Sequence, residues 1–193
     1  APMMKEVELF RIVHSDQSAE CQMYLRDKEK GRVFPVIIAM NEMAEIHRKV
    51  HGIPTRRPMT HDIFVSLMKA ARLSLQSVEI TELKDDVFYA KMNFKDENGR
   101  ALAIDARPSD SVAIATGVGA PLFANEKILD DIGIVEEDEA GGEAEEKAEG
   151  GRELPTGARP GDSVAIATGV GAPLFANEKI LDDIGIVEDE VAE

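Results

Sequence analysis

The chain has 193 residues, of which 44% are hydrophobic, and a formal net charge of −15, a size and composition that suit one hydrophobic core. Its longest apolar run, residues 34–40, is too short for a membrane span, and the first residues lack a secretory signal pattern. The single cysteine excludes an internal disulfide and suits a reducing compartment. We therefore expect a cytoplasmic protein of one domain, without a membrane partner.

In the N-terminal half, alternating apolar residues predict a hairpin of strands over residues 5–14 and 20–26, followed by a buried strand over 34–39. The pattern then becomes helical over residues 41–50. Thr60 is the expected N-cap of a second helix, which carries an apolar stripe at helical spacing.

In the second half, three strand-like segments separated by short polar turns predict an antiparallel meander. They are residues 77–83, 87–94 and 100–105. The remaining expected elements are a helix over 110–116 capped by Ser109, a short edge strand over 121–124, and a helix capped by Asn125 that ends at Gly133. The order βββ-α-α-βββ-α-β-α indicates an α+β fold, with helices packed on a mixed, mainly antiparallel sheet.

The sequence of the last elements in this order occurs a second time in the chain. Residues 106–136 return as residues 158–188, with Ser109 replaced by Gly161 as the only change. The segment before the second copy contains Pro155 and Gly157 where the first copy has a strand and Asp105, so the second copy lacks the parts around which a site would form. We expect residues 1–135 to form the working domain and residues 152–193 to be a partial duplicate of residues 100–140, not an independent domain.

The excess negative charge lies in this C-terminal part. Residues 1–105 contain 16 Lys and Arg and 16 Asp and Glu, and residues 136–151 alone contain eight acids and one Lys. Such a segment cannot bury enough apolar surface to offset the entropy of ordering, which predicts an acidic disordered linker over residues 136–151. A linker of this kind would also let the second copy displace the first, or dock into a neighbouring chain.

One basic stretch, residues 46–60, contains no acid and is the candidate surface for nucleic acid. Its cations are Arg48, Lys49, Arg56 and Arg57. The alternative interpretation is a solvated helix end, where cations are favoured by the helix dipole.

Two helix starts collect polar residues that could carry chemistry. His61 and Asp62 begin the second helix, and Asp105, Arg107 and Asp110 surround the start of the helix capped by Ser109. If the two starts lie side by side, they form an anion-binding crevice. Helix capping alone also explains the acids and the hydroxyl groups, but it explains His61 less well.

At these residues the sequence resembles the bifunctional nuclease family over about residues 5–133. The matching runs are Arg32-Val33-Phe34-Pro35-Val36-Ile37-Ile38 with Glu42 after it, Arg57-Pro58-Met59-Thr60-His61-Asp62, Asp86-Val87-Phe88-Tyr89-Ala90 and Asp105-Ala106-Arg107-Pro108-Ser109-Asp110-Ser111. The resemblance implies a nuclease that acts on DNA, RNA or both.

For this function we single out the family-matched residues Glu42, His61, Asp62, Arg107 and Asp110 as catalytic candidates. Imidazole suits proton transfer, arginine suits phosphate, and carboxylates permit a Mg²⁺ or Mn²⁺ site, for which we single out Asp105 and Asp110. The alternative function is a non-catalytic binding or regulatory module for a small anionic ligand or partner. In either case we expect a homo-oligomer, a dimer or larger.

Overall fold

The computed structural model describes residues 2–15, 19–135 and 163–167. Its strands before the last helix are β1 (Met4–Ser15), β2 (Glu20–Asp27), β3 (Arg32–Ala39), β4 (Ser74–Lys84), β5 (Val87–Lys95), β6 (Ala101–Ala106) and β7 (Leu122–Asn125). The helices are α1 (Met40–His51), α2 (Thr60–Ala70), α3 (Pro108–Val118) and α4 (Glu126–Ile132), and two further short strands are β8 (Ile134–Val135) and β9 (Ser163–Ala167). The expected fold class and the expected order of elements up to α4 are confirmed.

The strands form one nine-stranded sheet with the order β6-β5-β4-β7-β1-β2-β3-β8, and β9 pairs with β1 beside this path. All pairings are antiparallel except that of β4 with β7. The expectation that β7 is an edge strand is therefore wrong. A strand of four residues can lie inside the sheet because Leu122 pairs on one side with Val78 of β4 and on the other with Val7 of β1.

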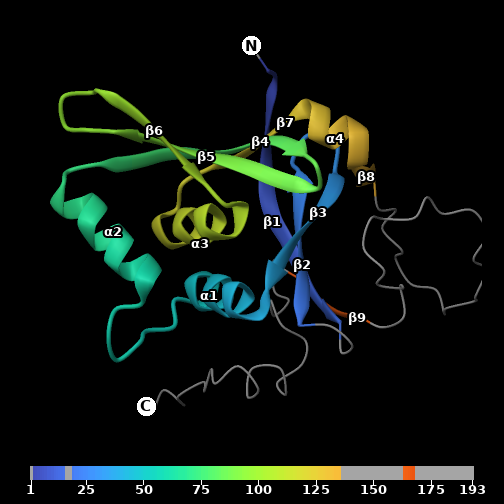
Figure 1. Cartoon of the computed structure of the whole chain (residues 1–193), viewed down its shortest axis with the longest axis horizontal. Coiled ribbons are helices and arrows are strands. Elements are labelled where there is room, and N and C mark those ends of the chain that lie inside the picture. Colours follow the sequence, from blue (N-terminus) through green and yellow to red (C-terminus); the bar gives the residue numbers. More distant parts are fainter. Residues whose placement is uncertain (1, 16–18, 136–162, 168–193) are drawn as a thin grey trace, which may run out of the picture.

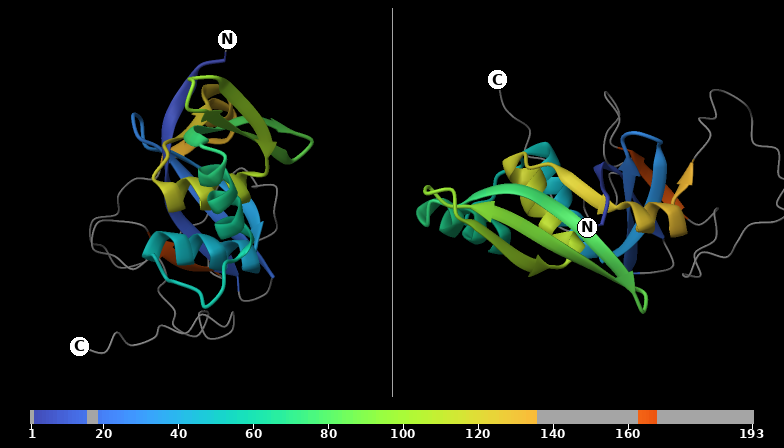
Figure 2. Two further views of the ribbon diagram at one scale, coloured as in Figure 1. Left: turned by 90° about the vertical axis from the view of Figure 1, so that its left-hand side faces the viewer. Right: turned by 90° about the horizontal axis from the view of Figure 1, so that it is seen from above.

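In Figure 1 the strands β4–β6 run across the direction of β1–β3, and α1 and α3 lie in the angle between them. Helix α3 fits there because its Val112, Ala113, Ile114 and Ala115 are all buried, and the small side chains of the two alanines let the helix approach its neighbours closely. Helix α2 forms the outer side of the domain, as the two further views in Figure 2 also show. This arrangement brings the first turns of α2 and α3 next to α1.

Two helices have N-caps other than those that the sequence predicts. The N-cap of α2 is Met59 and not Thr60, and the amide of Met59 donates to the carboxylate of Asp62 at 2.9 Å. The N-cap of α3 is Arg107, so Ser109 lies inside the first turn and is buried. Pro108 explains the second shift, because its fixed φ favours the first position of a helix. Asn125 caps α4 as expected, by accepting the amide of Lys127 at 3.1 Å.

Only one segment of the duplicated C-terminal part belongs to the described residues. It is β9, which pairs antiparallel with Arg11–Ser15 of β1. Its sequence, Ser-Val-Ala-Ile-Ala, is also that of Ser111–Ala115, which forms part of helix α3 in the first copy. The predicted acidic linker, residues 136–151, lies outside the described residues. No helix in the described part of the chain combines the length and the apolar character needed to cross a bilayer.

Candidate functional site

His61 lies in the first turn of α2, between two carboxylates from two other helices. Its Nε2 is 3.0 Å from Oδ1 of Asp110 on α3, and its Nδ1 is 3.5 Å from Oε1 of Glu45 on α1. The side chain is 19% exposed. The ring is therefore held in place on both edges while one part of it still meets solvent.

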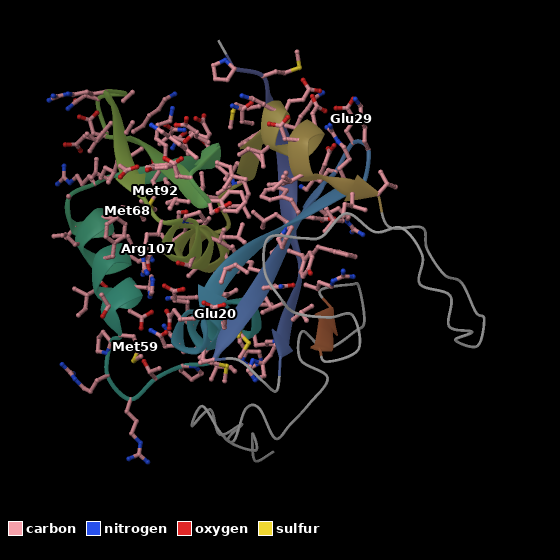
Figure 3. The ribbon with its side chains drawn as sticks, turned by 45° about the vertical axis from the view of Figure 1, so that its right-hand side comes forward. Glu20, Glu29, Met59, Met68, Met92 and Arg107 are labelled. Atoms are coloured by element: carbon pink, nitrogen blue, oxygen red, sulfur yellow. The ribbon has the colours of Figure 1, made fainter. Side chains whose placement is uncertain are left out.

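Arg107, the N-cap of α3, lies beside this imidazole and is the exposed part of the site. Its Nη1 is 2.6 Å from Oε1 of Glu42, and its Nε donates to Oδ2 of Asp110 at 2.8 Å. Figure 3 shows Arg107 in the space between α2 and α3. The side chain is 66% exposed, so the guanidinium is accessible to a ligand even though two carboxylates hold it.

Asp110 joins these two groups, because one of its oxygens faces His61 and the other accepts from Arg107. Burial raises the pKa of the carboxyl, but the hydrogen bonds with Arg107 and His61 outweigh burial and hold the pKa of Asp110 below its usual value. Asp110 is therefore an anion at neutral pH. We call Glu42, Glu45, His61, Arg107 and Asp110 the imidazole cluster.

A second group of charged residues, formed by Glu45, Arg48, Lys49 and Asp62, lies next to His61. Glu45 is buried and accepts two hydrogen bonds from Arg48, at 3.0 Å to Nε and 2.8 Å to Nη2. Arg48 also donates to both oxygens of Asp62 at 2.9 Å, and Lys49 donates to Asp62 as well. Burial works against the charge of Asp62, but these partners and the amide of Met59 hold its pKa far below the usual range.

This second group ties α1 to the start of α2 through paired charges. Buried charges need partners to be tolerated, and here each acid has at least one cation. The pairing fixes the orientation of Glu45, and Glu45 in turn faces Nδ1 of His61. The cluster is thus built by contacts between residues that lie far apart in the sequence.

The structure brings five predicted catalytic residues into this region: Glu42, His61, Asp62, Arg107 and Asp110. The starts of α2 and α3 therefore lie side by side, in contact through His61 and Asp110, and an anion-binding crevice between them stays a prediction. Asp105 is placed apart from them, because its side chain lines a different cavity with Thr81, Glu82 and Lys91.

The predicted nucleic-acid-binding residues divide into two pairs. Arg48 and Lys49 are 11% and 12% exposed and make the internal ion pairs with Glu45 and Asp62, whereas Arg56 and Arg57 lie exposed in the loop before α2. Their role in binding nucleic acid stays a prediction for both pairs.

Glu45 is a residue of the cluster that was not predicted from the sequence. Its spacing of three residues after Glu42 and three before Arg48 places all of them along α1, but only the folded structure shows that Glu45 is buried against His61.

The described carboxylates do not fit a divalent metal ion in this arrangement. No three His, Cys, Asp or Glu side chains within the described ranges are grouped so that they could hold one ion. The acids of the cluster instead face arginine, lysine or histidine, as the distances above show. We therefore assign no chemical step to a metal, and a requirement for Mg²⁺ or Mn²⁺ stays a prediction.

A cavity of about 230 Å³ lies next to Arg107. Its lining is partly apolar, and it consists of Val36, Ile37, Glu42, Asp86, Val87, Phe88, Arg107, Pro108 and Ser109. The two charged groups that it shares with the imidazole cluster are Glu42 and Arg107. A ligand in this cavity would therefore be in direct reach of the exposed guanidinium.

Comparison with known proteins identifies a family and two relatives that this chain resembles. The family model described as the bifunctional nuclease domain matches residues 23–137, a range that contains the whole imidazole cluster. Two similar curated proteins come from Mycobacterium tuberculosis, strains CDC 1551 / Oshkosh and ATCC 25618 / H37Rv. They are named uncharacterized protein MT1877 and uncharacterized protein Rv1829, and each is 36% identical over 141 residues, which cover 73% of this chain and 84% of the relative.

Proposed function

The chain belongs to the bifunctional nuclease domain family, and on this premise we propose that it hydrolyses phosphodiester bonds of DNA, RNA or both at the imidazole cluster. The observation that carries the proposal is a histidine held between two carboxylates next to an exposed arginine. Proton transfer and charge neutralisation are the two tasks that phosphodiester hydrolysis asks of side chains.

His61 can keep its hydrogen bond with Asp110 in both protonation states. In the neutral form, the ring donates one N–H to Asp110, which can only accept, and the lone pair of Nδ1 faces the carboxylate of Glu45 without a hydrogen bond. In the protonated form, both nitrogens carry hydrogens that face the carboxylates of Asp110 and Glu45. A group that serves as both base and acid within one fixed frame is what general acid–base catalysis requires.

Arg107 is the residue that would bind the phosphate. Its Nη1 and Nε face Glu42 and Asp110, and its exposed guanidinium has further N–H groups for phosphate oxygens. The first turns of α2 and α3 also lie at the cluster, and the positive end of a helix dipole favours an anion.

The approach of a nucleic acid would use the exposed loop before α2. Arg56 and Arg57 lie there without being buried in the internal ion pairs that hold Arg48 and Lys49. Binding through such cations weakens steeply as the salt concentration rises, because it releases counterions from the nucleic acid.

The alternative function is a non-catalytic oligomeric binding or regulatory module for a small anionic ligand or partner, and one separate observation supports its oligomeric part. Met59, Ile63 and Leu67 are 50%, 59% and 65% exposed, and they follow each other at intervals of four residues along α2. Met68 is the one residue of α2 that is buried. An apolar line of this kind suits contact with a second copy of the chain, so we propose a homo-oligomer under either function.

The experiment that separates the two functions compares turnover with binding. Purified full-length protein is incubated with single-stranded and double-stranded DNA and RNA, in EDTA, Mg²⁺ or Mn²⁺, and cleavage products are followed on denaturing gels. Cleavage of any of these substrates supports the nuclease. A rise in melting temperature with nucleotides or nucleic acid, without products under every condition, supports the binding module instead.

A further inference from the structure

A group of sulfur and nitrogen donors lies outside the imidazole cluster, around the chain's single cysteine. Cys21 on β2 is fully buried, and its Sγ lies 3.5 Å from Sδ of Met43 and 3.6 Å from Sδ of Met40, both on α1. On the other side, the same Sγ is 3.6 Å from Nδ1 of His14 on β1. Three elements of the fold thus bring one thiol, two thioethers and one imidazole together.

The separations match those between ligands of a single metal ion. An ion with metal–sulfur bonds of about 2.3 Å and a metal–nitrogen bond of about 2.0 Å, at tetrahedral angles, holds two sulfur ligands roughly 3.8 Å apart and a sulfur and a nitrogen ligand roughly 3.5 Å apart. The two sulfur–sulfur distances from Sγ of Cys21, 3.6 and 3.5 Å, are slightly shorter than the first value, and its sulfur–nitrogen distance of 3.6 Å is close to the second. A small outward movement of the two flexible methionine side chains would therefore open the centre.

We infer that His14, Cys21, Met40 and Met43 form a binding site for one Cu(I) ion. Thiolate and thioether sulfur are soft ligands that select Cu(I), and imidazole also suits copper. Oxygen ligands, which hard cations such as Mg²⁺ require, are not among the four donors.

The charge of the buried site distinguishes Cu(I) from a divalent ion. Binding converts the thiol and Cu(I) into a neutral copper thiolate and releases one proton to water, whereas a divalent ion would leave one uncompensated positive charge. Uncompensated charge is costly at a position without solvent exposure. Burial raises the pKa of the Cys21 thiol to about 11, so the cysteine is uncharged until a cation displaces its proton.

The site also has a route of entry. His14 and Met40 are partly exposed, while Cys21 and Met43 are buried, so an ion can meet the first two donors at the surface and then reach the thiol. None of the four residues belongs to the imidazole cluster. The copper site is therefore independent of the proposed nuclease function.

The test is a competition titration with reduced, full-length protein under anaerobic conditions. Cu(I) is supplied as its complex with a chromophoric chelator, and loss of the chelator's colour reports transfer of the ion to the protein. We expect one equivalent of Cu(I) per chain, and copper X-ray absorption should show sulfur neighbours at about 2.3 Å, the length of a metal–thiolate bond. A protein that takes no copper from the chelator would overturn the proposal.

Copper binding by single-residue variants shows which side chains hold the ion. Cys21→Ser should lose the binding, and Met43→Leu, which nearly conserves volume, should weaken it at least tenfold. Met92→Leu is the matched control, because Met92 is equally buried but lies on β5, and it should bind copper as the unchanged protein does. Melting temperatures of the metal-free variants verify that each one folds. Undiminished binding by Cys21→Ser, or tighter binding of Zn²⁺ than of Cu(I), would contradict the assignment.

Discussion

His47 should make the protein sensitive to mild acid. Its side chain lies buried on α1 with 2% exposure, and burial together with the nearby His51 lowers its pKa from 6.5 to about 4. In the unfolded chain the imidazole regains its ordinary pKa of 6.5. Between these two values the unfolded chain binds a proton that the native protein does not bind, so acid favours unfolding.

The magnitude follows from the width of this window. The free energy of unfolding should fall by up to about 1.4 kcal/mol for each pH unit below 6.5, and by roughly 3 kcal/mol in total at pH 4. Carboxylates with lowered pKa values, such as Asp62 and Asp110, lose their stabilisation only as the pH falls past their ordinary value of 3.8. The two effects therefore occupy different pH ranges.

Urea unfolding at several pH values between 7 and 4.5 measures this contribution when it is compared with His47→Gln. The two proteins need not be equally stable at pH 7, because only the change of stability with pH is compared. We expect the variant to lose most of the decline seen in the unchanged protein over this range. Parallel declines in the two proteins would refute a buried, neutral His47.

Three further changes have defined outcomes. Asp110→Asn should lower the cleavage rate by about 10²-fold or more, because the amide no longer orients His61 and Arg107 as a carboxylate does. The control is Asp131→Asn, a change of an exposed acid, which should leave the rate normal. Equal rates for the two variants in kinetic assays would contradict this prediction. Asp27→Asn should reduce the free energy of unfolding, measured by urea titration, by about 3 kcal/mol, because the buried Asp27 accepts two hydrogen bonds from Arg32. A reduction below about 1 kcal/mol would contradict the importance of this ion pair. Deletion of residues 137–193 removes the pairing of β9 with β1 but should leave the cleavage rate unchanged, because the whole imidazole cluster precedes these residues. Loss of activity in a truncated protein whose fold is intact by circular dichroism would indicate a role of the second copy.

The order of elements could be predicted because it depends on local patterns. Alternation of apolar residues, polar turns and the cap at Asn125 are all written in short stretches of the chain. The position of β7 inside the sheet could not be predicted in this way. It depends on pairing with β1 and β4, which are distant in the sequence.

Part of the candidate site could also be predicted, since His61 and Asp110 each stand at the start of a helix. Glu45 escaped prediction because it looks like an ordinary surface acid of α1 until α2 packs over it. Asp105 is the opposite case. It is only five residues from Asp110 in sequence, but the last residues of β6 carry its side chain to another cavity.

The duplicated segment illustrates the limit of local reasoning most clearly. The same five residues, Ser-Val-Ala-Ile-Ala, form part of helix α3 in the first copy and strand β9 in the second. In the first copy, the packing of α3 against α1 stabilises the helix. Pro108 does not distinguish the copies, because Pro160 stands at the same position of the second copy. In the second copy, the pairing with β1 provides hydrogen bonds for an extended chain. Tertiary contacts thus decide between two conformations of one sequence.

The central claim is that His61 transfers protons during cleavage, and a comparison of two histidine variants tests it most directly. Single-turnover cleavage rates are measured for the unchanged protein, for His61→Ala and for His51→Ala, whose exposed ring lies outside the imidazole cluster. We predict that His61→Ala lowers the rate by about 10²–10⁴-fold while His51→Ala leaves it unchanged. Equal rates for the His61→Ala variant and the unchanged protein, with both folded, would contradict the claim.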